Sequence, residues 1–179
     1  MNLKSYSPII TNSILFSILL IFLRIDLVFS DSLPTGGDMG AHIVPTKFFV
    51  SELISNLKIS GWSNDWFAGY PAYYFYFPLP PLVVAILSPF FSFGIAFKIM
   101  VVTSLVLLVF SIQKLISQED KISSHLGFAA GLLFLLTESF TIFGGNLASS
   151  LAGQYSFTYS LAFGNLSIYF LTKSNLKNS

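Results

Sequence analysis

The sequence predicts an all-α integral membrane protein with about four to five membrane helices and one amphipathic surface helix. The first observation is composition: of 179 residues, 54% are hydrophobic and 9% are charged, and the mean hydropathy is +0.74. Soluble domains carry about 25% charged residues, so this composition is typical of a protein surrounded by lipid. The second observation is a series of long apolar segments, and the third is an amphipathic segment that follows the first of them.

Charge and cysteine content exclude several classes of function. The net charge is +1, which gives no electrostatic basis for nucleic-acid binding. Because the chain has no cysteine, it has no disulfides, thiolate metal sites or cysteine nucleophiles. The sequence also lacks a glycine-rich phosphate loop, an HExxH motif and a nucleophile elbow. The usual chemistry of soluble enzymes is therefore unsupported.

The apolar segments divide the chain into one membrane module, expected to be a fragment of a longer protein. Arg24 and Asp26 follow the first apolar core, and no small-x-small site precedes Ser30, so we expect a retained helix rather than a cleaved signal peptide. The expected order within residues 1–179 is a membrane helix at 8–29, an extracytoplasmic loop at 30–78 with a surface helix at 42–58, a short or re-entrant segment at 79–93, membrane helices at 96–116 and 125–143, a loop motif at 144–156 and a membrane helix at 157–171.

The segment at 79–93 decides the topology, because it is short and contains three prolines. If it spans fully, the basic loop at 114–125 lies on the same side as Asp38. If it does not span, that loop lies inside, as the positive-inside rule prefers, and the motif at 144–156 shares a side with Asp38. We favour the second arrangement.

The expected surface helix at 42–58 has apolar residues at helical spacing, while Lys47, Glu52 and Lys58 occupy much of its other face. This pattern favours a helix that lies flat on the membrane. The alternative is a helix that packs on another layer of the protein.

Asp38 is the first candidate for chemistry, since Gly36, Gly37 and Gly40 let the backbone approach a ligand closely. A carboxylate there can act as a general base or hold a metal-bound phosphate. His42 lies four residues on and shares a helix face with Asp38 if the helix starts there, which allows proton relay or joint ligation. The alternative is that Asp38 only caps the helix.

The stretch 61–81 contains two Trp, four Tyr and three Phe. Within it, the polar residues Asn64 and Asp65 precede Trp66, and Tyr70 follows. Rings beside polar groups suit a sugar site, because ring faces stack on C–H groups while polar atoms bond hydroxyls. The alternative is an interfacial aromatic belt, which leaves the Gly-Tyr-Pro turn unexplained.

Four further residues are candidates for substrate binding. Glu138 lies in an apolar run, where an ionisable side chain is costly unless it is paired or faces water, so a function is expected for it. Asn146 and Gln154 flank a run rich in small residues, which equally suits tight helix packing. Lys98 heads an apolar segment and either binds phosphate or extends its ammonium group to the membrane surface.

Two motifs carry a resemblance to a known family. The segments Gly61–Trp62, Trp66–Pro71 and Tyr76–Pro80 resemble one motif of the bacterial and archaeal membrane family labelled 6-pyruvoyl-tetrahydropterin synthase-related, and Gly145–Phe157 resembles its second motif. The resemblance covers roughly residues 10 to 172. The order of first helix, acidic loop, surface helix and aromatic-proline segment also resembles the start of GT-C glycosyltransferases. Those enzymes are several hundred residues long, so the resemblance covers their N-terminal part only.

The resemblance implies an inverting glycosyltransferase that uses a polyprenyl-phosphate sugar donor. The first-loop acid of such enzymes acts as a base or metal ligand, and Asp38 matches its position, with His42 expected to assist. A divalent cation is an optional cofactor, because a strict Asp-x-Asp is absent. The implied partners are membrane lipid, the lipid-linked donor and another membrane protein, and the implied location is a prokaryotic plasma membrane. The alternative functions are a non-catalytic scaffold or assembly partner, and a transporter with ionisable residues in several helices.

Overall fold

The computed structural model describes residues 7–117, 121–137 and 144–178. This part of the chain is mostly helical, which confirms the predicted helical class. The elements are α1 (Ser7–Phe22), α2 (Ile25–Val28), α3 (Met39–Phe48), the π-helical turn η2 (Phe49–Leu53), the 3-10 turn η3 (Ile54–Asn56), β1 (Gly61–Ser63), β2 (Tyr70–Ala72), α4 (Leu79–Leu87), α5 (Phe93–Ile116), α6 (Lys121–Leu135), α7 (Leu147–Ser149), the π-helical turn η4 (Ser150–Gln154) and α8 (Tyr155–Asn178).

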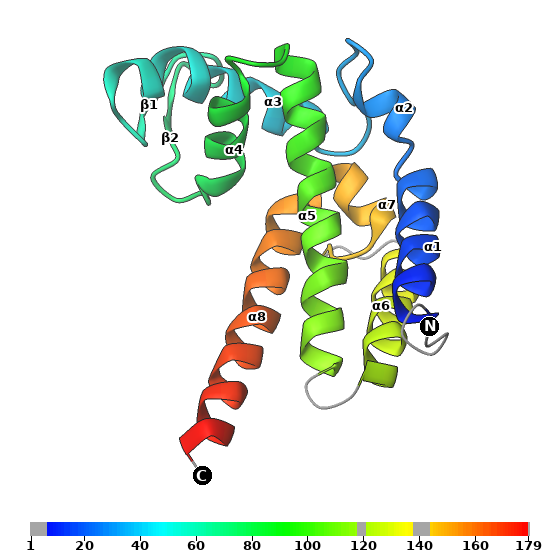
Figure 1. The fold of residues 1–179 in the computed structure, drawn as a ribbon. Coiled ribbons are helices and arrows are strands. Elements are labelled where there is room, and N and C mark those ends of the chain that lie inside the picture. The colour runs from blue at the N-terminus through cyan, green and yellow to red at the C-terminus, as the bar shows by residue number, and fades with distance from the viewer. Residues whose placement is uncertain (1–6, 118–120, 138–143, 179) are drawn as a thin grey trace.

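Helix α5 is the centre of the molecule. Helices α6 and α8 both pack along it, and α1 packs against α6 (Figure 1). Gly127 and Gly131 of α6 allow this close approach, since an added Cβ at either would lie 3.0 Å from the α5 backbone. One core cluster joins α1, α5 and α6, and a second joins α3, α4, α5 and α8 at the end where α5 begins.

Helix α5 is the one helix in the described residues that is long and apolar enough to cross a bilayer, by length and composition. Shorter apolar helices lie at Ile10–Phe22 and Ser124–Leu135. Helix α4 has nine residues, so it is about 14 Å long, against about 30 Å for a bilayer core. Helix α8 is long but contains many polar residues.

The first helix is shorter than the expected 8–29. It ends at Phe22, and Arg24 adopts a left-handed backbone conformation (φ 48°) before the short α2. Lys98 of α5 holds the chain that follows this bend, because its ammonium donates to the carbonyl oxygens of Leu27 and Ser30. The bend directs the chain away from the α1 axis.

The expected surface helix begins earlier and is not regular. Helix α3 starts at Met39, and the turns η2 and η3 continue it to Asn56. The apolar side chains of Phe49 and Leu53 are buried, and η2 packs against α4. This face therefore contacts another layer of the protein, as in the alternative weighed for this segment.

Strands β1 and β2 form an antiparallel hairpin, with Trp62 opposite Pro71. The sequence analysis expected a shaped turn here but no strands. Phe67 and Ala68 have positive φ angles of 54° and 61°, and Gly69 has one of 115°. Only glycine fits at position 69 without strain, since the Trp62 ring packs directly over it.

Two distant segments meet at the end of the molecule where α5 begins. The backbone N–H of Asp38 donates to the carbonyl oxygen of Ala152 at 2.8 Å. The motif at 144–156 therefore lies beside Asp38. Figure 1 shows the opposite end of α5 far from α3.

Candidate active site

Asp38 occupies the N-cap position of α3 but does not cap it. Its side chain makes no hydrogen bond to the first turn of the helix, and the residue is exposed. Its carboxylate is therefore not used in capping, contrary to the structural alternative considered for it.

Asp38 and His42 pack directly against Gly153. It has a φ of 115°, and an added Cβ would lie 3.1 Å from Asp38 Cβ, 3.1 Å from His42 Cδ2 and 3.2 Å from His42 Nε2. Glycine alone meets both requirements, a left-handed backbone and no side chain. The second motif thus positions the two residues singled out in the first loop.

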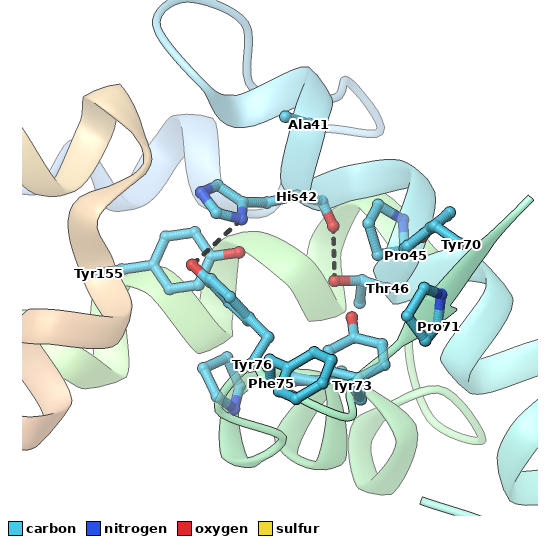
Figure 2. A pocket seen from close by; sticks show the side chains of 12 residues that line it. Ala41, His42, Pro45, Thr46, Tyr70, Pro71, Tyr73, Phe75, Tyr76 and Tyr155 are labelled. Atoms are coloured by element: carbon cyan, nitrogen blue, oxygen red, sulfur yellow. Dashed lines mark hydrogen bonds between the residues drawn. The ribbon is translucent and has the colours of Figure 1, made fainter. Parts of the chain in front are cut away.

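The ring of His42 contacts the rings of two tyrosines, and both lie below it in the view of Figure 2. The Tyr155 ring packs edge-on at 5.2 Å between centroids, and the Tyr76 ring lies tilted at 5.6 Å. The Tyr76 hydroxyl is 3.5 Å from His42 Nδ1, a long hydrogen bond. One His42 nitrogen therefore points toward Tyr76, and the other lies against Gly153.

A cavity of about 280 Å³ opens beside His42. It lies between α3, β2, the segment before α4, and the start of α8. Its walls are mainly rings, from proline and aromatic side chains, with few polar atoms. The lining residues are Ala41, His42, Pro45, Thr46, Tyr70, Pro71, Tyr73, Phe75, Tyr76, Pro80, Pro81 and Tyr155 (Figure 2).

Hydrogen bonding and burial set the polar character of the cavity. The buried Thr46 hydroxyl donates to the His42 carbonyl oxygen at 2.7 Å, so it stabilises α3. Burial raises the pKa of Tyr73 far above its usual range, and burial also raises the pKa of Tyr70. Both phenols therefore stay protonated at neutral pH and can donate hydrogen bonds.

Burial lowers the pKa of the His42 imidazole, and the negative charge of Asp38 offsets part of this shift. His42 is therefore neutral at pH 7, with a free lone pair on one ring nitrogen. A neutral imidazole with a nearby carboxylate can accept a proton, because the carboxylate stabilises the imidazolium that forms.

The other candidates in the stretch 61–81 have different positions relative to the cavity. Tyr70 lines the cavity, and Trp66 stacks on it, with 5.9 Å between centroids and 24° between planes. Asp65 accepts a hydrogen bond from the buried Ser63 hydroxyl at 2.8 Å, which supports the hairpin. Asn64 is exposed and is not part of the lining.

Lys98 does not reach this cavity. Its ammonium donates to two carbonyl oxygens and to the Ser30 hydroxyl at 3.0 Å. These three bonds use the three donors of the ammonium. The structure thus gives Lys98 a role in fixing the chain after α2, outside the lining of the cavity beside His42.

The remaining candidates lie in or before the second motif. Asn146 is buried and caps α7, since its side-chain oxygen accepts from the Ser149 N–H at 2.9 Å. Gln154 ends η4, next to Gly153, and does not line the cavity. Glu138 lies outside the described residues.

Sequence reasoning did not select Tyr76, Tyr155 or Gly153 as site residues. Tyr76 and Tyr155 flank His42, and Gly153 supports it. All three lie within the two motifs that carried the family resemblance. Their chemistry alone gave no signal, because tyrosines and glycines are common at helix ends and membrane surfaces.

The described residues do not form a metal site by themselves. Among them, no group of three or more His, Asp or Glu side chains is placed to hold an ion. Asp38 and His42 supply two potential ligands, and Mg²⁺ sites combine such carboxylates with substrate phosphates. The site is accordingly interpreted through its own side chains.

The site is thus a ring-lined cavity with a neutral histidine in its wall and an exposed carboxylate one helical turn away. The first motif, in the stretch 61–81, contributes Tyr70 and Tyr76, and the second motif, at 144–156, contributes Gly153 and Tyr155. Comparisons of this chain with protein-family models, curated proteins and solved structures found no match.

Proposed function

We propose that this protein is an integral membrane glycosyltransferase module of the GT-C type, which transfers a sugar from a polyprenyl-phosphate donor to an extracytoplasmic acceptor. The observation that carries the proposal is the placement of His42 and Asp38 beside the ring-lined cavity, on the backbone of Gly153. The two motifs that resemble the 6-pyruvoyl-tetrahydropterin synthase-related family meet there, which supports a shared function for them.

The cavity suits one sugar ring. At about 280 Å³, it is slightly smaller than the usual small-molecule pocket, for which volumes start at about 300 Å³. Its proline and aromatic walls offer apolar faces for C–H groups, while the protonated tyrosines offer hydrogen-bond donors at a few points. A long isoprenoid chain needs a different surface.

In the proposed reaction, the acceptor hydroxyl attacks the anomeric carbon of the donor sugar. The new carbon–oxygen bond forms as the bond to the phosphate oxygen breaks, and the polyprenyl phosphate leaves with that electron pair. His42 takes the hydroxyl proton, and Asp38 stabilises the imidazolium. This reverses the two roles expected from sequence, because His42 lines the cavity and Asp38 does not.

The proposed setting is a prokaryotic plasma membrane, with α5 as a span and α1, α6 and α8 as further membrane segments around it. The apolar composition, the packing of α6 and α8 along α5, and the packing of α1 against α6 support this arrangement. In this proposed arrangement, the cavity would lie at the membrane surface, near the phosphate of the proposed donor. Membrane lipid and another membrane protein are the proposed partners.

The proposal is tested by sugar transfer from a radiolabelled polyprenyl-phosphate donor in membranes that contain the protein. The variants His42→Gln and Asp38→Asn keep similar shapes, and we expect each to lower the rate by about 10²-fold or more. His125→Gln is the matched control, since His125 bonds Asn12 at the other end of the molecule. It is expected to retain activity.

Equal transfer by wild type and both variants would disprove the catalytic assignment. Absence of transfer by wild type with every donor and acceptor class, alongside normal folding, would favour the non-catalytic scaffold. Transfer that fails only in Asp38→Asn would return the base role to Asp38.

A further inference from the structure

The lining of the cavity beside His42 contains no charged side chain. It consists of alanine, proline, tyrosine, phenylalanine and threonine residues, together with His42, which is neutral at pH 7. Within the part of the chain that the structure describes, no Asp, Glu, Lys or Arg lines it. Its polar side chains are therefore uncharged hydroxyl groups and one imidazole.

The charged side chains around this cavity do not favour an anion in it. The ammonium of Lys47, on α3, lies over the Phe93 ring at 5.4 Å from its centroid, and Lys98 is bonded to carbonyl oxygens after α2. Asp38 packs on Gly153 beside His42 and is negatively charged. An anionic ligand would lose its hydration in the cavity without gaining a cation, and Asp38 would repel it. The cavity therefore favours an uncharged ligand.

Tyr155 supplies a buried hydroxyl group to this lining. The residue is 2% exposed, and its ring is held edge-on by Phe97 of α5 at 5.9 Å and by His42 at 5.2 Å between centroids. Figure 2 shows the hydroxyl directed away from α8, toward His42 and Tyr76. Among the described residues, no group forms a hydrogen bond with it. Buried polar groups without a partner are rare, and a ligand in the cavity can supply the missing partner.

Tyr73 is held in the same lining with a strained backbone. Its φ is 59°, a left-handed conformation that a bulky side chain rarely adopts. Its ring packs edge-on against Phe49, with 5.0 Å between centroids. Strain of this kind persists where the surroundings fix the residue, and it is common at ligand sites. Tyr73, Tyr76 and Tyr155 thus bring three phenol groups to one cavity.

We propose that this cavity selects an uncharged sugar and that the Tyr155 hydroxyl binds one of the sugar hydroxyl groups. The identification of the ligand as a sugar rests on the proposed function. A phenol both donates and accepts hydrogen bonds, which suits a sugar hydroxyl, and the ring walls suit its C–H faces. Uronic acids are excluded, because their carboxylate would be desolvated with no cation in the lining. The phosphate of the proposed donor would lie outside the cavity for the same reason.

The test is equilibrium binding of sugars to the purified protein in a detergent without a sugar headgroup, with dissociation constants measured by saturation-transfer NMR titration. The probes are the methyl glycosides of glucose, mannose and galactose, and those of the three corresponding uronic acids. We expect wild type to bind at least one neutral glycoside, and to bind its uronic acid at least about tenfold more weakly. Tyr155→Phe keeps the ring and should weaken binding of the neutral glycoside by about tenfold. Ala41→Trp, at an exposed position of the lining, should block it.

Each variant has a matched control. Tyr159→Phe also removes a buried hydroxyl, one turn later in α8, but this hydroxyl donates to the Met100 carbonyl oxygen at 2.8 Å and lies outside the lining. Ala148→Trp places the same new ring at an exposed position outside the lining. Both controls should bind the neutral glycoside as wild type does.

Equal binding of a neutral glycoside and its uronic acid by wild type would overturn the proposal, as would wild-type affinity in Tyr155→Phe. Absence of binding by every probe would also overturn it, and so would unchanged binding by Ala41→Trp, which would place the sugar elsewhere. This assay contains no lipid-linked donor, so its outcome is separate from that of the transfer assay. Selective binding without transfer would contradict only the proposed reaction, whereas transfer without selective binding would contradict only the proposed selectivity.

Discussion

At the scale of single residues, the site depends on a histidine that is kept neutral and a glycine that lets it pack closely. His42 is held between two tyrosine rings and the backbone of Gly153. The rings exclude water and thereby oppose protonation, while Asp38 favours it. The balance leaves a neutral base in the cavity wall at pH 7.

His42 should make stability depend on pH. Its folded pKa is lowered, so the unfolded chain, with a pKa of about 6.5, binds the proton more readily. The stabilisation is therefore present above pH 6.5 and is lost as pH falls through this value toward the lower folded pKa. Thermal unfolding in detergent from pH 8 to 5 should show this loss, and His42→Gln should reduce it. His125→Gln should retain the wild-type slope, and a slope unchanged in His42→Gln would contradict this prediction.

Gly153→Ala should damage the site more than the fold. The new methyl group meets Asp38 and His42 near 3.1 Å, and the positive φ costs about 1–3 kcal/mol. We expect transfer to fall by about 10²-fold through misplacement of the pair. Gly164→Ala is the control, because its methyl group would have no neighbour within 4 Å. Equal activity of the two variants would disprove the positioning role of Gly153.

At the scale of elements, the first loop is fixed by contacts from helices that follow much later in the chain. Lys98 of α5 holds the carbonyl groups at the end of α2, and the Ser92 hydroxyl before α5 donates to Asp31 at 2.7 Å. The carbonyl of Ala152 receives the Asp38 N–H. These bonds fix the loop at both ends, which orients α3 and its histidine.

Lys98→Met should lower stability without a specific effect on donor binding. The variant leaves the carbonyl oxygens of Leu27 and Ser30 without their donor, at a cost of about 1–3 kcal/mol of unfolding free energy. The exposed Lys114→Met should change it by less than about 0.5 kcal/mol. Thermal unfolding measures both. A raised KM for the lipid-linked donor with unchanged stability would instead support a phosphate-binding Lys98.

At the scale of the whole molecule, the cavity beside His42 lies near the start of α5, and Lys114 lies near the other end of this helix. The contact between Asp38 and Ala152 makes the loop after α1 and the motif before α8 neighbours. Lys114 lies in the last turn of α5, at the other end (Figure 1). In a membrane, this arrangement separates the site from the basic loop, as the positive-inside rule prefers.

The absence of cysteine makes this arrangement directly testable. Single-cysteine variants at the exposed positions Asn64, Ala148 and Lys114 can be labelled in intact cells with a membrane-impermeant maleimide. Asn64→Cys and Ala148→Cys should be labelled together, and Lys114→Cys only after permeabilisation. Labelling of Lys114→Cys with Asn64→Cys in intact cells would contradict the proposed topology.

Much of the helical framework could be predicted from the apolar runs and from the loop residues that separate them. The expected helix at 96–116 corresponds to α5, and the proximity of Asp38 and His42 follows from their spacing of four residues in α3. The early end of α1 was not predicted, because Arg24 adopts a left-handed conformation there and Lys98 of α5 then holds the carbonyl oxygen of Leu27. The hairpin was missed as well, since strands of three residues leave no periodic pattern.

The sequence by itself determined the helical class, the apolar character and the candidate pair Asp38 and His42, because these follow from composition and local spacing. The tertiary structure alone decided that Gly153, Tyr76 and Tyr155 surround His42, and that Lys98 fixes a loop. The physical reason is that side-chain roles depend on contacts between residues more than 30 positions apart. Local sequence patterns do not predict such long-range contacts. These contacts nevertheless determine which side chains are buried and which hydrogen-bond partners they have.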